Sequence, residues 1–370
     1  MEKKVADLSA NERKLTESYQ LVVETMGVNK FFGLGPLAGK SKFSAIFFVC
    51  ATLTASVFAL KNRFHSLGER SPIVGRMALG QPLFEALFSL YCFVYFSFFA
   101  KDCKKDLIDA MNKLELSVNV RFKENFHWLK PRIIIILIEF LALYIYTFYI
   151  SITNNRFNIL IILSAQFIAV NCTLQICVYY LVITNWLRNK YDNFNSMIVS
   201  ICEKPYSKFD EKIDNIIDYL EKSSTVVKLN NKLFGTSIFT SNCLFIYIIL
   251  YTTVSLFDGR EREDSTLNTL KCIFPIPFVL YLIVLAMACD AVEKSGKRVI
   301  KTCYLFVEEL KDAAKKEQLR LLARYAEQWC PVFSAAGFYD INQSCLTSIF
   351  SAILTYFVII IQFNMVLSDQ

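Results

Sequence analysis

Polar side chains form a line along the last apolar segment of the chain. Their steps of three or four residues keep them within a narrow sector of one face of an α-helix. With Ile359 filling one gap, the line consists of Ser344, Ser348, Ser351, Thr355 and Gln362. Such a face suits water or a polar partner, whereas a helix surrounded by lipid has no use for it. The segment Cys345–Val366 is about as long as the ~20 residues of one membrane crossing.

The composition is typical of a polytopic membrane protein. Of 370 residues, 54% are hydrophobic and only 20% are charged, and the apolar residues fall in blocks. The net charge of +7 is dispersed among loops and paired with acids, which argues against nucleic acid as a partner. The two histidines are far apart, and no nucleophile elbow or dinucleotide fingerprint is present. We therefore expect no enzyme activity, no metal site and no cofactor.

Hydropathy predicts an all-α fold with seven transmembrane helices. The predicted spans are Phe43–Leu60, Met77–Ala100, Ile133–Ile152, Phe157–Ile183, Ser237–Leu256, Cys272–Cys289 and Cys345–Val366. Lys and Arg number 32 in the segments of one side and 8 in those of the other. Because basic residues mark the cytoplasmic side, we expect an intracellular N-terminus, an extracellular C-terminus and a multi-pass location in the plasma membrane.

The same reasoning divides the chain into seven regions. We expect a cytoplasmic N-terminal segment (1–42), helices one to four (43–183), a cytoplasmic helical extension (184–236), helices five and six (237–289), a cytoplasmic helical anchor (290–344), helix seven (345–366) and an extracellular tail (367–370). Within the extension and the anchor, apolar residues recur at helical spacing: Ile213, Ile216, Ile217, Leu220, Leu305, Leu310, Leu319 and Leu322. These stretches predict amphipathic helices that pack as an intracellular platform, the alternative being helices that lie on lipid headgroups.

A sequence signature lies within the last span. Residues Thr355–Phe363 read Thr-Tyr, five apolar residues, then Gln-Phe, and the chain approaches this span through Gly337-Phe338-Tyr339-Asp340. Both features, together with Gly33-Leu34-Gly35-Pro36 before the first span, resemble the insect gustatory receptors. Sugar receptors of that family commonly carry Glu after Thr-Tyr, where this chain has Phe357. This departure disfavours the main sweet-sensing branch and leaves bitter-type and fructose-like receptors open.

The resemblance implies a ligand-gated cation channel related to insect odorant receptors. Four subunits, as a homotetramer or together with other gustatory receptor subunits, would surround one central pore lined by helix seven. Partners would be a small-molecule tastant, permeant cations and membrane lipid. The pore or gate residues would then be Ser348, Ser351, Thr355, Ile359, Gln362 and Phe363.

Each pore residue also has a simpler structural interpretation. Gln362 is costly in hydrocarbon and would suit a ring of amides around cations, but Gln also joins membrane helices by hydrogen bonds. Phe363 and Ile359 would form a hydrophobic constriction or merely pack. Tyr356, one residue off the line, is expected to face a neighbouring helix, where it would couple ligand binding to the pore or make a structural hydrogen bond.

The ligand pocket implied by the resemblance lies between the outer halves of helices two to six. An aromatic cavity with few polar groups is the usual small-molecule site. The candidates are Gln81, Glu85, Phe88, Tyr144, Gln166, Tyr247, Tyr251, Phe278 and Tyr281. An interfacial aromatic belt explains the tyrosine of helix three equally well.

Two other functions are compatible with a polytopic chain. A metabotropic seven-helix receptor would have the opposite topology, and the loop charges oppose it. A secondary transporter usually shows helices broken at mid-membrane, for which the 11 Gly and 8 Pro of this chain, mostly outside the spans, offer little support.

Overall fold

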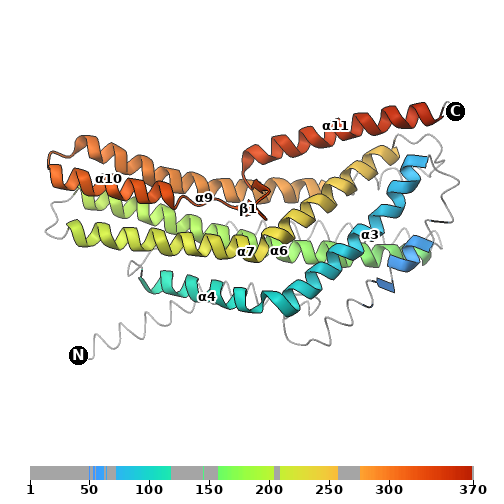
Figure 1. Ribbon diagram of the computed structural model, residues 1–370, viewed down its shortest axis with the longest axis horizontal. Helices are drawn as coiled ribbons and strands as arrows, with labels where there is room; N and C mark the ends of the chain where they lie inside the picture. The colour runs from blue at the N-terminus through green and yellow to red at the C-terminus, as the bar shows by residue number, and fades with distance from the viewer. Residues whose placement is uncertain are drawn as a thin grey trace.

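Long helices account for nearly all of the described structure. The computed structural model describes residues 72–117, 157–203, 209–256 and 276–368, a few positions between 50 and 64, and Ile145. The elements, labelled as in Figure 1, are α3 (Pro72–Val94), the π-helical turn η3 (Tyr95–Phe99), α4 (Ala100–Ser117), α6 (Phe157–Glu203), α7 (Phe209–Leu256), α9 (Ile276–Glu309), α10 (Ala313–Gln328), β1 (Ser334–Ala335), β2 (Tyr339–Asp340) and α11 (Gln343–Ser368). The predicted all-α class is confirmed; the antiparallel pair β1–β2 is a short hairpin before α11.

Three stretches of the described helices are long and apolar enough to cross a membrane. They are Ile73–Glu115, Phe209–Leu256 and Gln343–Phe363. The first two contain the predicted spans two and five, and the third covers the predicted span seven as far as Phe363. Most of the first predicted span and nearly all of the third lie outside the described residues. The count of seven spans therefore stays a prediction.

Several helices are far longer than a bilayer is thick. Helix α6 has 47 residues and α7 has 48, so each is roughly 70 Å long against a hydrocarbon core of roughly 30 Å. The starts of α3 and α6 and the ends of α7 and α11 lie at one end of the molecule, on the right of Figure 1. These are the ends for which the loop charges predict an extracellular position, so the relative topology agrees with that prediction.

The opposite end of the molecule is a helical platform. Ile213, Ile216 and Leu220 of α7 are buried there, as are Leu319 and Leu322 of α10. Polar contacts join α6 to α9 outside this apolar core. Thr302 donates to the Asn195 side chain at 2.6 Å, and Ser295 donates to Asp192 at 2.9 Å. The predicted packing of these stretches against one another is confirmed.

The anchor region differs from the prediction in two respects. The Asp312 side chain accepts a hydrogen bond from the backbone N–H of Ala314 and caps a new helix, so α9 and α10 are separate helices that lie side by side (Figure 1). Leu305, predicted to belong to the packed face, is 51% exposed. The buried residues of the same part of α9, Val299, Cys303 and Val307, follow one another at steps of four, and Leu305 lies off that face.

Candidate pore and ligand-binding sites

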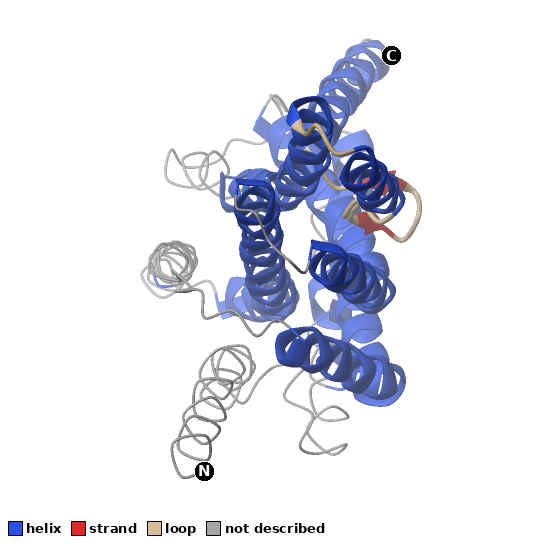
Figure 2. Ribbon diagram, turned by 90° about the vertical axis from the view of Figure 1, so that its left-hand side faces the viewer, coloured by secondary structure: helices blue, strands red, loops and turns tan. Residues whose placement is uncertain are grey.

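One face of α11 packs against the rest of the chain. Leu346 and Ile349 pack against the main apolar core, and Phe357 and Ile360 pack against a smaller cluster of α3 and α7 residues. The helix lies along the edge of the bundle, with the C-terminus at its periphery (Figures 1 and 2). The residues on its other faces are mostly exposed.

The polar line lies on the face of α11 opposite to this packed one. Ser348, Ser351, Thr355 and Gln362 are all exposed, and Ile359 is 38% exposed. The Thr355 hydroxyl donates to the backbone carbonyl of Ser351 at 2.9 Å, which satisfies it within the helix. The Gln362 carboxamide makes no hydrogen bond to any residue that the structure describes. The Gln362 amide is therefore exposed on the surface of α11 and open to a polar partner.

Two aromatic residues border the polar line. Tyr356 is 56% exposed and Phe363 is 61% exposed, so neither side chain is buried within its own subunit. The position of Tyr356 against a neighbouring helix and its coupling role therefore stay predictions.

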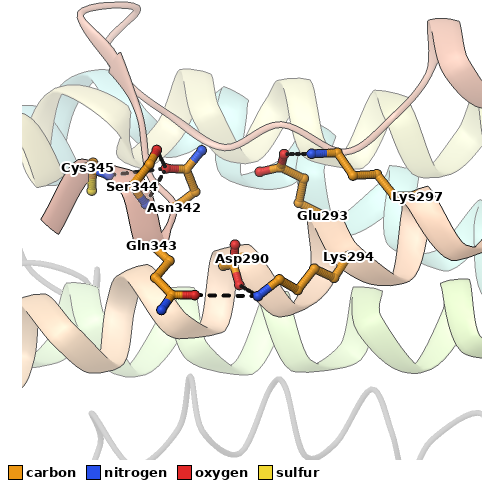
Figure 3. A network of polar contacts seen from close by, with 8 residues as sticks. All are labelled: Asp290, Glu293, Lys294, Lys297, Asn342, Gln343, Ser344 and Cys345. Carbon is orange, nitrogen blue, oxygen red and sulfur yellow. Dashed lines mark hydrogen bonds and ion pairs between the residues drawn. The ribbon is translucent and has the colours of Figure 1, made fainter. Parts of the chain in front are cut away.

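The first turn of α11 lies beside charged residues of α9 (Figure 3). The Asn342 side-chain oxygen accepts hydrogen bonds from the backbone N–H groups of Ser344 and Cys345 and so caps the helix. The Gln343 side-chain oxygen accepts from Lys294 at 3.5 Å. Two ion pairs of 2.6 Å occupy the same stretch of α9, namely Asp290–Lys294 and Glu293–Lys297. The start of the polar line therefore lies next to balanced positive and negative charge.

The candidate ligand residues of α3 and α7 lie where these two helices contact each other. Gln81 and Glu85 are each 2% exposed, and the Gln81 amide donates to the Glu85 carboxylate at 2.8 Å. The Tyr247 hydroxyl donates to the carbonyl of Met77 at 2.6 Å. Tyr251 belongs to the small apolar cluster on which α11 also rests. Because α11 packs against the same apolar cluster, these residues of α3 and α7 lie beside the candidate pore helix.

A second group joins α7 to α9. Phe278 and Tyr281 both contact the ring of Phe245, with ring centroids 4.6 Å and 4.9 Å apart. The Tyr281 hydroxyl lies 3.3 Å from the Ser241 hydroxyl. Phe278 and Tyr281 are 1% and 2% exposed. This group is aromatic with few polar atoms, the composition expected of a small-molecule site.

The remaining candidates contribute less to either group. Phe88 is buried in the main core. Gln166 lies on α6, where its side chain is outside the described part, and Tyr144 lies outside the described residues. The structure thus brings together candidates of α3 with α7 and of α7 with α9.

Two polar residues with long-range contacts were absent from the sequence-based candidates. The Asn242 amide on α7 donates to the Tyr339 hydroxyl of the hairpin at 2.6 Å. A separation of 97 residues leaves no periodic signal for such a pair. Only the hairpin's resemblance to the family's approach to helix seven pointed to this segment.

The fold is a bundle of long helices, three of them with stretches apolar enough to cross a membrane, with a helical platform at one end and an edge helix that bears a polar face. The profile of the 7tm chemosensory receptor family matches residues 43–367. The chain therefore belongs to this family.

Relatives of known identity agree with the family assignment. The chain is 27% identical over 117 residues to gustatory and pheromone receptor 39a, isoform D, and 30% identical over 135 residues to gustatory receptor 68a, both of Drosophila melanogaster. These segments cover 31% and 35% of this chain, and 30% and 33% of the respective relatives. The matched segments thus span about a third of each relative's length.

Solved structures match over a larger share of the chain. The insect olfactory receptor OR5 from Machilis hrabei is similar with a TM-score of 0.64, 14% identity, and coverage of 88% of this chain and 91% of the receptor. Its complex with eugenol gives a TM-score of 0.68 at 13% identity, covering 95% of this chain and 100% of the receptor. At these identities the likeness establishes the fold, which is that of the insect olfactory receptors.

Proposed function

We propose that this chain is a gustatory receptor subunit that forms a ligand-gated, non-selective cation channel. Four copies would surround one path in the plasma membrane, with the N-terminus in the cytoplasm and α11 lining the path. The single observation that carries the proposal is the uncovered polar face of α11. A helix of spanning length presents Ser348, Ser351, Thr355 and Gln362 away from its own subunit.

The alternative surroundings for this face are unfavourable. Against acyl chains, an unpaired amide such as that of Gln362 costs several kcal/mol. Against water at a subunit axis, the same amide is hydrated and offers its oxygen to passing cations without the tight binding of a charged ring. Ile359 and Phe363 flank Gln362 and supply apolar groups that close the path by dewetting. Ile359, Gln362 and Phe363 are all exposed on the single chain, which fits this arrangement.

The ligand would bind among the two buried groups that share α7. Phe278 and Tyr281 offer aromatic surface, and Gln81 with Glu85 offers hydrogen-bonding atoms. The structurally similar olfactory receptor was solved with eugenol, a small aromatic molecule. Phe357, in the place of the sugar receptors' acid, packs against an apolar cluster. These features favour a bitter or plant secondary compound over an ordinary sugar, with fructose-like sugars as the alternative.

The decisive experiment is whole-cell recording of Gln362 variants in cells that express the full chain. Eugenol, caffeine, D-fructose and sucrose form the test panel. Gln362→Glu is expected to raise the relative permeability to Ca²⁺, and Gln362→Leu to reduce current severalfold, because only a lumen residue changes the field acting on ions. Ile353→Leu is the matched control, since Ile353 lies on the opposite, packed side of α11. Unchanged permeation in both Gln362 variants, or no current with any compound, would overturn the proposal.

A further inference from the structure

The start of α11 is attached firmly to the β1–β2 hairpin. Only Ile341 and Asn342 separate the hairpin from the first residue of the helix. The backbone N–H of Ile341 donates to the carbonyl of Phe333 at 2.7 Å, and both of these side chains are buried. A displacement of the hairpin therefore displaces the first turn of α11.

The hairpin in turn rests on α7. The Asn231 side chain donates to the carbonyl of Val332 at 2.9 Å and accepts from the backbone N–H of Ser334 at 3.3 Å. At Gly235, a Cβ atom would lie 2.9 Å from the backbone nitrogen of Ala336, so only glycine permits this close approach. The hairpin backbone is thus held directly against one helix.

The contacts continue along the same face of α7, one turn at a time. Phe338 stacks on Phe239 with ring centroids 4.3 Å apart, and the Asn242 amide donates to the Tyr339 hydroxyl at 2.6 Å. Together with Asn231 and Gly235, these positions follow one another at steps of four, four and three residues, the spacing of a single helix face. The Asn242–Tyr339 bond is the contact nearest to the candidate ligand residues.

The neighbouring residue connects this face to the second ligand group. Ser241 lies 3.3 Å from the Tyr281 hydroxyl, and Tyr281 contacts the ring of Phe245 one turn further along α7. One turn of α7 therefore contacts aromatic candidates of α9 on one side and the hairpin on the other. A ligand that moves Tyr281 acts on the segment that holds Tyr339.

The Asn242 amide is only partly satisfied in this arrangement. Its side-chain oxygen is buried and accepts no hydrogen bond from any residue within the described ranges. A buried acceptor without a partner is costly, so a small shift of α7 that supplies one is favourable. Coupling between two sites requires an element that can adopt two arrangements. A residue such as Asn242, whose hydrogen bonding would improve after a small shift, fits such an element.

We propose that the hairpin Ser334–Asp340, held to α7 by the Asn242–Tyr339 hydrogen bond, transmits ligand occupancy between α7 and α9 to the start of the pore helix. Asn242 and Tyr339 are positioning residues in this scheme, because neither touches the permeating ion. The inference rests on the proposed channel function. It assigns to this pair the coupling that the sequence suggested for Tyr356.

A double-mutant cycle tests the pair in the full-length channel. Tyr339→Phe removes only the hydroxyl, and Asn242→Leu replaces the amide by an apolar group of similar size. We expect each to shift the half-maximal concentration of the activating panel compound by about 3- to 10-fold, the range of one buried hydrogen bond. The double variant is expected to match the single ones, because all three lack the same bond. Current without any added compound is recorded as a second readout of the same cycle.

The controls separate coupling from folding. Thr240→Val is the matched control on α7, because the hydrogen bonds of Thr240 to described residues go to backbone carbonyls of its own helix. A merely structural role would lower surface protein and maximal current while half-maximal concentration and basal current stayed unchanged. That result, or single effects that add in the double variant, would overturn the inference. If Gln362 variants still alter permeation, the channel proposal stands even though the coupling inference is overturned. If Gln362 variants do not alter permeation, the channel proposal and the coupling inference both fail.

Discussion

At the scale of single residues, Gly80 and Tyr247 pack closely together in the candidate ligand region. A Cβ at Gly80 would collide with the Tyr247 hydroxyl, which already donates to the carbonyl of Met77. The ring of Phe84 also contacts the Tyr247 ring, with their centroids 4.9 Å apart. The absence of a side chain at Gly80 therefore sets how closely α3 approaches α7 beside the ligand candidates.

Gly80→Ala is expected to lower the unfolding free energy by about 1–3 kcal/mol, the usual cost of overpacking. The nearest atom is the hydroxyl, so adding Tyr247→Phe to Gly80→Ala should recover part of the loss. Thermal denaturation of the purified receptor in detergent measures both changes. A double variant that is less stable than the sum of its two single variants would contradict this account.

At the scale of elements, the charges beside the first turn of α11 are nearly balanced. Asp290 and Glu293 have side chains that are 15% and 17% exposed, whereas Lys294 and Lys297 are 62% and 63% exposed. The N-terminus of a helix carries a partial positive charge. The lysines are therefore the residues through which charge at the inner mouth of the proposed pore is most easily changed.

Lys294→Gln is expected to raise outward single-channel conductance to cations severalfold at low ionic strength, because Asp290 is left without its counter-charge. The effect should fall as salt is raised. Lys301→Gln is the matched control, since Lys301 is exposed on the same face of α9 about 10 Å further from α11. Equal conductance in the two variants would show that Lys294 is remote from the ion path.

At the scale of the whole molecule, the platform of α6, α7, α9 and α10 combines a buried core with uncovered apolar residues. Leu322 of α10 is fully buried, whereas its neighbour Leu321 is 42% exposed. Tyr304 and Leu305 of α9 are likewise 43% and 51% exposed. In the proposed tetramer, such uncovered apolar groups are suited to contact between subunits.

Leu322→Ala is expected to destabilise each subunit by about 2–5 kcal/mol through the cavity that it leaves. Leu321→Ser should leave the melting temperature nearly unchanged and reduce the tetramer fraction in size-exclusion chromatography with light scattering. The pair separates folding from assembly, because the two residues are adjacent in sequence. A tetramer fraction unaffected by Leu321→Ser would remove this face from the subunit interface.

Residue spacing within single helices predicted correctly which side chains share a face. The steps between Ser348, Ser351 and Thr355 predict a shared face, and they do share one, because helical geometry alone sets that relation. The buried Ile213 and Ile216 follow from the same periodicity. Leu305 is exposed because α9 and α10 are separate helices, and a pattern drawn across both does not define the buried face of α9.

The sequence by itself determined an all-helical membrane chain, the polar line of its last helix and the resemblance to gustatory receptors, because these depend on composition and short-range spacing. Only the tertiary structure decided that the polar line faces away from the packed core, that Gln81 and Glu85 are both buried, and that Asn242 holds Tyr339. Which helix covers a given face, and which residues 97 positions apart meet, depends on how long helices cross. No spacing along the chain encodes those crossings.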